Sequence, residues 1–336
     1  MTKQRIEYID AMRGFTMILV VYSHICSLCL GDMWMGWNDV FFLFRLPCFF
    51  FISGWLFEKT DRQWNMVSIK ATVRHKFMVQ IIPTFIFLLL LAPPPLFFSR
   101  LGATKGGYWF TFALFEFFVL TIFSERYMKK WGGVFAVAIS ATAFCYDIYF
   151  NSYFKDMGLL TDSLGFLSFM TWRYFLFFYV GTWVKRNFDR FVQWTERWWV
   201  LLVVVVGFVV IAMLPHSDNA WSEYLIFVVG GIFGLTMIFT FFRAFSYLFS
   251  KDKWLGRSLQ YIGTRTLDIY LLHYFVLPKF LILHRDLLLA YDSRLLEFLV
   301  VISIALVVVC LCLLVSYVIR LSPFLGHYLF GVDDHK

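Results

Sequence analysis

Long stretches without a charged residue recur along the chain and constrain its fold more than any other feature. Residues 77–99, 198–217, 224–242 and 298–319 contain no Asp, Glu, Lys or Arg. About 20 apolar residues are enough for a helix to cross the roughly 30 Å hydrocarbon core of a bilayer. The sequence therefore predicts an all-α, polytopic integral membrane protein.

Ten membrane spans are predicted from these stretches and from others like them. They cover residues 12–30, 39–57, 77–92, 108–123, 133–150, 166–184, 198–214, 222–242, 259–282 and 295–319. Only 15% of the 336 residues are charged, whereas a soluble domain carries about 25% charged residues. Because the gaps between spans are short, a single transmembrane domain is predicted for residues 1–336, with no separate soluble domain.

The positive charges lie mostly on one side of this predicted domain. One set of alternate segments carries 20 Lys and Arg residues, and the other set carries 6. Lys and Arg are retained on the cytoplasmic side of membranes, so both termini are predicted to be cytoplasmic. The formal net charge of +8 follows from this bias, and no nucleic-acid partner is predicted from it.

Arg13 and His24 lie on nearly the same face of the first predicted span, with ten residues between them. Eleven residues of helix rise about 16 Å and turn about 1100°, which is about 20° more than three full circles. Arg13 would lie at the cytoplasmic rim and His24 a little beyond the middle of the membrane. Ionisable groups inside a bilayer are costly and mark functional sites, so this face is predicted to line a cavity that opens to the cytoplasm.

This pair suits the transfer of a group from a phosphorylated carrier. Histidine exchanges protons near neutral pH because its ordinary pKa is about 6.5, and arginine binds phosphate or carboxylate with a fork of donors. Arg13 could hold the carrier at the rim while its reactive end reaches His24. A structural interpretation has equal weight: Arg13 extends its charge to the rim, and His24 forms a hydrogen bond with a neighbouring helix.

The second predicted span contains Arg45 and, two residues later, Pro47. Proline removes a helical hydrogen bond, so a kink or break is predicted there. An irregular backbone segment within a membrane is tolerated only where it faces other protein segments or a water-filled cavity. Arg45 would lie toward the outer half of the membrane and is a candidate for substrate binding.

Four further residues within the spans are candidates for a substrate-binding or structural role. Trp109 and Glu116 are seven residues apart and share a face of the fourth span. Tyr270 and His273 share a face of the ninth span. For Glu116 and His273, a structural hydrogen bond is favoured over catalysis.

These stretches together resemble the membrane-bound acyltransferase 3 superfamily over most of the chain. The similar stretches, in chain order, are YIDAMRGFTMILVVYSHI, FRLPCFFFISGWLF, VRHKFMVQIIP, YWFTFALF and GTRTLDIYLLH. Within the superfamily, the chain is most similar to the sugar O-acetylases of the fucose 4-O-acetylase type. It departs from them in the second span, where Arg45 stands in place of the histidine of a Phe-His-Met-Pro stretch. It departs again where relatives repeat arginine three residues apart, because Phe77 follows Arg74 at that distance.

The resemblance implies a membrane O-acyltransferase, and most simply an O-acetyltransferase. Acetyl-CoA or another acyl-CoA would bind from the cytoplasm, with Arg13, Arg74 and Lys76 as donor-binding residues and no metal. His24 would act as general base on the acceptor hydroxyl or carry the acyl group transiently, and the two roles are not distinguished. Arg45 would bind an anionic acceptor or stabilise an oxyanion.

The resemblance also implies where the reaction takes place. The acceptor would be a cell-surface or lipid-linked glycan on the outer side of a bacterial plasma (inner) membrane, and membrane lipid would be the other partner. The acyl group, the acceptor hydroxyl and assembly into a homo-oligomer are left open. The main alternative is a polytopic transporter or flippase of glycans or small metabolites. Transporters often contain two similar halves, which this sequence does not show.

Overall fold

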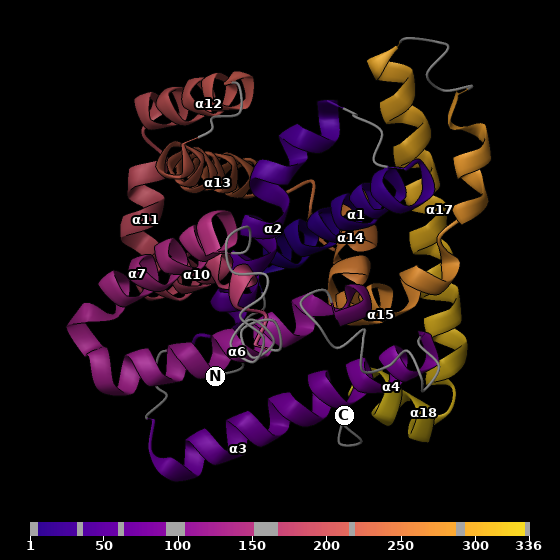
Figure 1. Ribbon diagram of the computed structural model, residues 1–336, viewed down its shortest axis with the longest axis horizontal. Helices are drawn as coiled ribbons and strands as arrows, with labels where there is room; N and C mark the ends of the chain where they lie inside the picture. Colours follow the sequence, from indigo (N-terminus) through magenta and orange to yellow (C-terminus); the bar gives the residue numbers. More distant parts are fainter. Residues whose placement is uncertain are drawn as a thin grey trace. The chain divides into compact units, whose positions relative to one another are not determined.

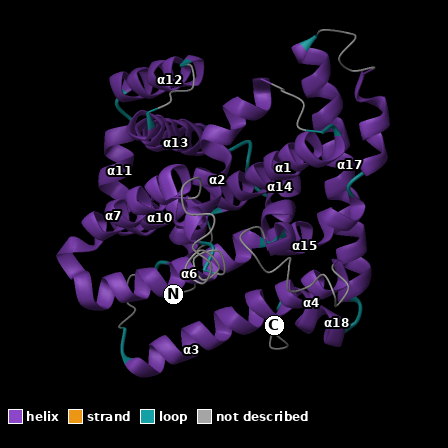
Figure 2. Cartoon of the chain, in the orientation of Figure 1, coloured by secondary structure: helices purple, strands orange, loops and turns teal. Residues whose placement is uncertain are grey.

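The described part of the chain consists of helices joined by loops and turns (Figure 2). The computed structural model describes residues 6–31, 36–59, 64–91, 105–150, 167–214, 219–286 and 293–332. Within these ranges no strand is formed, so the all-α prediction is confirmed. The two chain ends, which are predicted to be cytoplasmic, lie outside the described residues.

Five of the described helices are long and apolar enough to cross a membrane. They cover Glu7–Cys29, Trp37–Phe57, Met66–Leu91, Trp221–Ala244 and Arg294–Arg320. A sixth span results if the helices Phe188–Thr195 and Trp198–Met213, which meet at 79°, are counted as one. Multi-pass membrane character is therefore confirmed, and the number of ten spans stays a prediction.

The remaining predicted spans correspond to shorter helices. The fourth is α6 (Trp109–Phe123), and the fifth begins with α7 (Gly132–Cys145). The sixth contains a short 3-10 turn, η6 (Phe169–Tyr174), followed by α10 (Phe175–Arg186). At about 1.5 Å per residue, α6 and α7 are each shorter than the hydrocarbon core of a bilayer when counted without the π-helical turns η3 (Ser124–Met128) and η5 (Tyr146–Phe150) that continue them.

The chain forms two compact units, and the first comprises residues 1–49, 190–215 and 227–318. Its central helix is α1 (Glu7–Cys29), which packs against α14 (Trp254–Thr264) and α15 (Thr266–Val276) (Figure 1). In the apolar window of α1, 72% of the residues are buried, compared with 28% in α17 (Arg294–Arg320). An apolar helix as exposed as α17 is suited to lipid contact, whereas α1 is suited to carry buried functional groups.

Two glycines allow α1 and α14 to approach at backbone distance. A Cβ atom on Gly14 would collide with the carbonyl oxygen of Leu259, and one on Gly263 would collide with the carbonyl oxygen of Asp10. Small residues at such crossings are typical of helix pairs in membranes, because they let the two backbones pack closely. The position of α14 along α1 is therefore fixed by backbone contact.

The ninth predicted span, residues 259–282, is not one helix. The helical path ends at Thr264 and resumes at Thr266, and Arg265 between them has φ −117° and ψ 23°. The second helix, α15, ends at Val276, shortly before Pro278, which cannot donate a backbone hydrogen bond. The break at Arg265 contains neither Gly nor Pro, so the sequence pattern gave no signal for it, whereas the end of α15 is followed by Pro278.

The predicted break at Pro47 is not found. The helix α2 (Gly36–Phe57) is continuous and contains Pro47 in its interior. Its residues up to Phe49 belong to the first unit and those from Phe50 belong to the second. Arg45 therefore lies on a continuous helix and belongs to the same unit as α1.

The second unit comprises residues 50–189, 216–226 and 319–336. It contains α6, α7 and α10, and a helical run made of α3 (Met66–Lys76), η1 (Phe77–Ile81) and α4 (Ile82–Leu91). The C-terminal helix α18 (Pro323–Phe330) packs against α4. Gly54 of α2 contacts the carbonyl group of Phe178, and Gly181 of α10 contacts that of Phe51. This unit, like the first, contains a helix pair packed at backbone distance.

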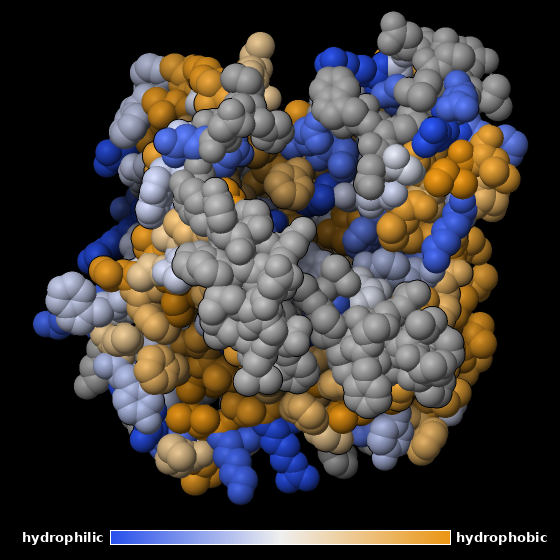
Figure 3. Space-filling view, in the orientation of Figure 1, coloured by the Kyte–Doolittle hydropathy of each residue, from blue (hydrophilic) through white to orange (hydrophobic). Residues whose placement is uncertain are grey.

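Many large apolar side chains of the described residues are exposed. Apolar side chains, orange in Figure 3, occupy wide areas of the face shown. On α12 (Trp198–Met213) and α17 the exposed apolar side chains include Leu202, Val206, Val307 and Leu314. Such a surface is costly in water and is expected where lipid surrounds the protein.

Candidate functional site

Arg13 and His24 lie three turns apart on α1, as the spacing predicts. Both side chains are half-buried, whereas Met17 and Val20, between them on the same face, are buried. Gly14, next to Arg13, is the point at which α1 touches α14. Arg13 therefore lies beside the α1–α14 crossing, and His24 lies farther along α1, where α15 approaches it.

His24 is in direct contact with His273 of α15. Nδ1 of His24 lies 2.8 Å from Nε2 of His273, and the two rings are nearly parallel at a centroid distance of 4.8 Å. His273 is fully buried, and its Nδ1 lies 3.2 Å from the carbonyl oxygen of Ile269. The structure thus joins two predicted site residues that are 249 positions apart in the sequence.

Two tyrosines of α15 surround this pair. The hydroxyl group of Tyr274 lies 3.5 Å from Nε2 of His24, and its ring centroid is 4.1 Å from that of His273. The ring of Tyr270, a predicted site residue, lies 5.8 Å from that of His273. The sequence singles out Tyr270 and not Tyr274, yet of these two it is Tyr274 that has a described contact with His24. A contact between helices distant in the sequence leaves no signal in the local pattern.

Arg45 is a cation close enough to this pair to influence His24. It is only 8% exposed, and it interacts electrostatically with His24. Its Nη1 donates a 2.8 Å hydrogen bond to Oδ1 of Asn38, and its guanidinium lies 5.4 Å from the centroid of the Phe42 ring. These contacts hold the cation on α2, within electrostatic reach of the imidazole.

A buried polar contact also fixes α15 on its other side. The hydroxyl group of Ser316 on α17 donates a hydrogen bond to the carboxylate of Asp268. Both side chains are almost fully buried. Because Asp268 is held by α17 and His273 by α1, the rotation of α15 about its axis is constrained from both sides.

Trp109 and Glu116 belong to the second unit and have different partners. Nε1 of Trp172 donates a 2.7 Å hydrogen bond to Oε2 of Glu116. Trp109 stacks against Tyr174 at a centroid distance of 6.2 Å. The predicted shared face exists, and the structure gives Glu116 the hydrogen-bonded environment that a structural role requires.

A buried lysine, Lys105, interacts with Glu116. In the sequence it is only one of the 6 Lys and Arg residues in the predicted outer loops. Lys105 is 1% exposed and has a left-handed backbone with φ 45°. Burial lowers its pKa to about 8, although the nearby Glu116 opposes that change. Its Nζ lies 5.4 Å from the centroid of the Phe112 ring.

Lys76 lines an open cleft in the second unit, whereas Arg74 does not. The cleft has a volume of about 290 Å³. It is lined by Leu56, Phe57, Lys59, Ala71, Thr72, His75 and Lys76. The two ammonium groups, the imidazole and the hydroxyl group of this lining can each donate a hydrogen bond to phosphate. Of the two predicted donor-binding residues on α3, Lys76 lines this cleft and Arg74 does not, and Lys59 joins it from beyond the end of α2.

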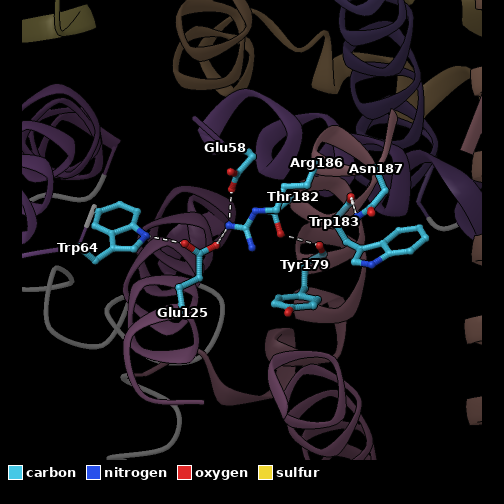
Figure 4. A network of polar contacts seen from close by, with 8 residues as sticks. All are labelled: Glu58, Trp64, Glu125, Tyr179, Thr182, Trp183, Arg186 and Asn187. Carbon is cyan, nitrogen blue, oxygen red and sulfur yellow. Dashed lines mark hydrogen bonds and ion pairs between the residues drawn. The ribbon is translucent and has the colours of Figure 1, made fainter. Parts of the chain in front are cut away.

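A second polar network lies where α2, α6 and α10 end (Figure 4). Nη2 of Arg186 donates to Oε2 of Glu58 at 2.7 Å and forms a second ion pair with Glu125. Nε1 of Trp64 donates to the other carboxylate oxygen of Glu125. In the sequence, Arg186 is only one of the 20 Lys and Arg residues on the predicted cytoplasmic side. In the structure it ties three helix ends together.

Replacing Arg186 by methionine is expected to lower the free energy of unfolding by about 1–3 kcal/mol. Removing one partner of a fully buried ion pair costs about 3–5 kcal/mol, and the Arg186 side chain is 36% exposed, so water screens part of the effect. Thermal unfolding in detergent measures this change. Arg190→Met, at an exposed position, is the control and should have little effect.

A double variant tests the cause of that loss. With Arg186 removed, Glu58 is a buried carboxylate without its cation, so Glu58→Gln should restore part of the stability lost by Arg186→Met. If the two single substitutions simply add, the ion pair is not the source of the stability.

Comparison with known proteins agrees with this description of the chain. A family model described as an acyltransferase domain, Acyl_transf_3, matches residues 6–320. No curated protein and no solved structure matches the chain. The family match covers α1 to α17, and thus every residue named above except those of α18. The chain therefore belongs to the acyltransferase 3 family and is a multi-pass membrane acyltransferase.

Proposed function

We propose that the protein is an O-acyltransferase, and most simply an O-acetyltransferase, that moves an acyl group from cytoplasmic acyl-CoA to a hydroxyl of a cell-surface or lipid-linked glycan. The observation that carries this proposal is the contact between His24 and His273. A half-buried imidazole on a membrane-crossing helix is held at 2.8 Å by a fully buried one. The family supplies the reaction class, and transfer to a hydroxyl needs a base of this kind.

In the proposed reaction, His24 takes the proton of the acceptor hydroxyl while the hydroxyl oxygen attacks the thioester carbonyl carbon. The new C–O ester bond forms, the C–S bond breaks, and the departing CoA sulfur receives the proton from His24. Arg45, a cation in electrostatic reach of His24, would stabilise the oxyanion of the intermediate or bind an anionic acceptor. A transient acyl-histidine is an alternative route that uses the same imidazole.

The proposal includes a membrane topology and a location. We infer ten spans with both termini in the cytoplasm of a bacterial cell, in its plasma membrane. The five long apolar helices and the bent pair support six of these spans, and the distribution of Lys and Arg supports the orientation. The similarity to fucose 4-O-acetylase-type enzymes supports a sugar as acceptor.

A labelling experiment tests the proposed function. Membranes with and without the protein are incubated with acetyl-CoA that carries a radioactive acetyl group, and the label in the glycan and lipid fractions is counted before and after mild alkali. Mild alkali cleaves O-esters and spares amides, so we expect alkali-labile label that depends on the protein. If no such label forms and the purified, folded protein does not bind CoA, the transporter alternative is favoured instead.

The cleft on α3 gives a prediction about donor binding. Lys59→Ala and Lys76→Ala are each expected to raise the Kd for CoA about tenfold, because a charge-assisted hydrogen bond to phosphate contributes about 1.5 kcal/mol. Calorimetric titration of the protein in detergent measures this effect. Lys70→Ala and Arg74→Ala, at positions on α3 that do not line the cleft, should change Kd by less. Equal losses at all four positions would mean that general charge, and not the cleft, attracts CoA.

A further inference from the structure

The hydrogen bonds around His273 determine which nitrogen of His24 is basic. We propose that His273 is a positioning residue, which holds the His24 ring with its proton on Nδ1 and so presents Nε2 to the acceptor hydroxyl. This inference rests on the proposed function for the identity of the reaction. The arrangement of protons can be tested without it.

The backbone carbonyl of Ile269 determines which nitrogen of His273 is protonated. A carbonyl oxygen can only accept a hydrogen bond, and it lies 3.2 Å from Nδ1 of His273. His273 is fully buried, so water cannot replace a missing donor there. Nδ1 of His273 must therefore carry a hydrogen. The opposite tautomer would place two lone pairs against each other in a buried site, which costs about 1–3 kcal/mol.

The protonation of His273 in turn determines which nitrogen of His24 is protonated. A neutral imidazole has one N–H group, so Nε2 of His273 has a lone pair and accepts a hydrogen bond. Its partner at 2.8 Å is Nδ1 of His24, which must then be the donor. This leaves Nε2 of His24 without a hydrogen, as a general base requires. The same reasoning explains the role of the carboxylate in a Ser-His-Asp triad, where it fixes the tautomer of the base.

The position of the Tyr274 hydroxyl group shows that an O–H donor can approach Nε2 of His24. The hydroxyl of Tyr274 lies 3.5 Å from this nitrogen, which is the outer limit for a hydrogen bond. His24 is half-buried whereas His273 is fully buried, so only the first of the two rings can reach a substrate. His24 is thus assigned to contact the acceptor, and His273 acts through it.

Two substitutions at position 273 separate a positioning role from a packing role. Glutamine carries an amide oxygen that can accept from Nδ1 of His24, whereas methionine has a similar size and no such acceptor. His273→Met is expected to lower kcat about 100- to 10,000-fold with KM for acetyl-CoA nearly unchanged, as when a base loses its tautomer. His273→Gln should recover activity to within about tenfold of the wild type, since it restores the acceptor. A folded His273→Met enzyme with the wild-type kcat would overturn the proposal, as would equal losses in both variants.

Nitrogen NMR on the wild-type protein gives a second test that needs no acceptor. The protein is labelled at its seven histidines, and His24→Ala identifies the His24 signals. We expect His24 to be protonated at Nδ1 and unprotonated at Nε2. In His273→Met we expect a mixture of the two His24 tautomers. The reverse tautomer in the wild type would overturn the inference. If the expected tautomer is found and no acyl group is transferred, the proposed function fails while the assignment of His273 stands.

Discussion

Replacing His24 by alanine is expected to lower the rate of acyl transfer about 1,000- to 10,000-fold. General-base catalysis contributes up to about 10,000-fold. Among the described residues, the imidazole in contact with His24 is that of the fully buried His273, which cannot take its place at the substrate. The initial rate at saturating acetyl-CoA, measured as alkali-labile label in the glycan or lipid fraction, gives this loss. The Kd for acetyl-CoA should change little, since His24 acts on the acceptor.

Two other substitutions serve as controls for His24→Ala. His284→Ala removes an exposed histidine of the same unit and should leave the rate unchanged. Arg13→Ala should instead weaken acetyl-CoA binding, because Arg13 is proposed to hold the donor at the rim. If His24→Ala abolished donor binding and Arg13→Ala did not, the proposed roles of the two residues would be wrong.

The part of the site carried by α1 could be predicted because it depends on one helix. Helix geometry alone places Arg13 and His24 on one face, and the absence of charged residues between them places that face in a membrane. The all-α fold follows from the same apolar stretches. Such predictions need no knowledge of which helices are neighbours.

The remainder of the site depends on contacts between distant parts of the chain. Nothing in a single sequence indicates that His24 and His273, 249 positions apart, share a hydrogen bond. The break at Arg265 separates α14 from α15 without Gly or Pro, so an apolar pattern cannot show it. The ion pairs of Arg186 were missed for the same reason, because their partners lie 61 and 128 positions away.

The glycine contact between α1 and α14 connects the fold to the site. The helix α15, which carries His273, begins two residues after α14 ends, so its position follows from the α1–α14 crossing. Gly14 and Gly263 form that crossing on backbone atoms. A change in their spacing would shift α15 relative to α1 and separate the two histidines.

Gly14→Ala and Gly263→Ala are therefore expected to lower the free energy of unfolding by about 3 kcal/mol or more each. Overpacking a core costs about 1–3 kcal/mol where side chains can move, but here the added methyl group meets the carbonyl groups of Leu259 and Asp10, which belong to helices and cannot rotate away. The midpoint of thermal unfolding in detergent, together with the yield of folded protein, measures the effect. Activity should fall with stability, because α15 moves.

Gly133→Ala is the matched control for these two variants. Gly133 lies within α7, and the nearest atom to an added Cβ there is Cε1 of Tyr179 at 3.9 Å, an ordinary van der Waals distance. Alanine is favoured over glycine inside a helix by about 0.5–1 kcal/mol, so Gly133→Ala should leave stability unchanged or raise it slightly. If all three alanines had the same effect, the loss would reflect glycine content in general and not the approach of α14 to α1. A loss of stability confined to the Gly14 and Gly263 variants would show that the α1–α14 crossing requires glycine at both positions. This crossing is the one that positions His273.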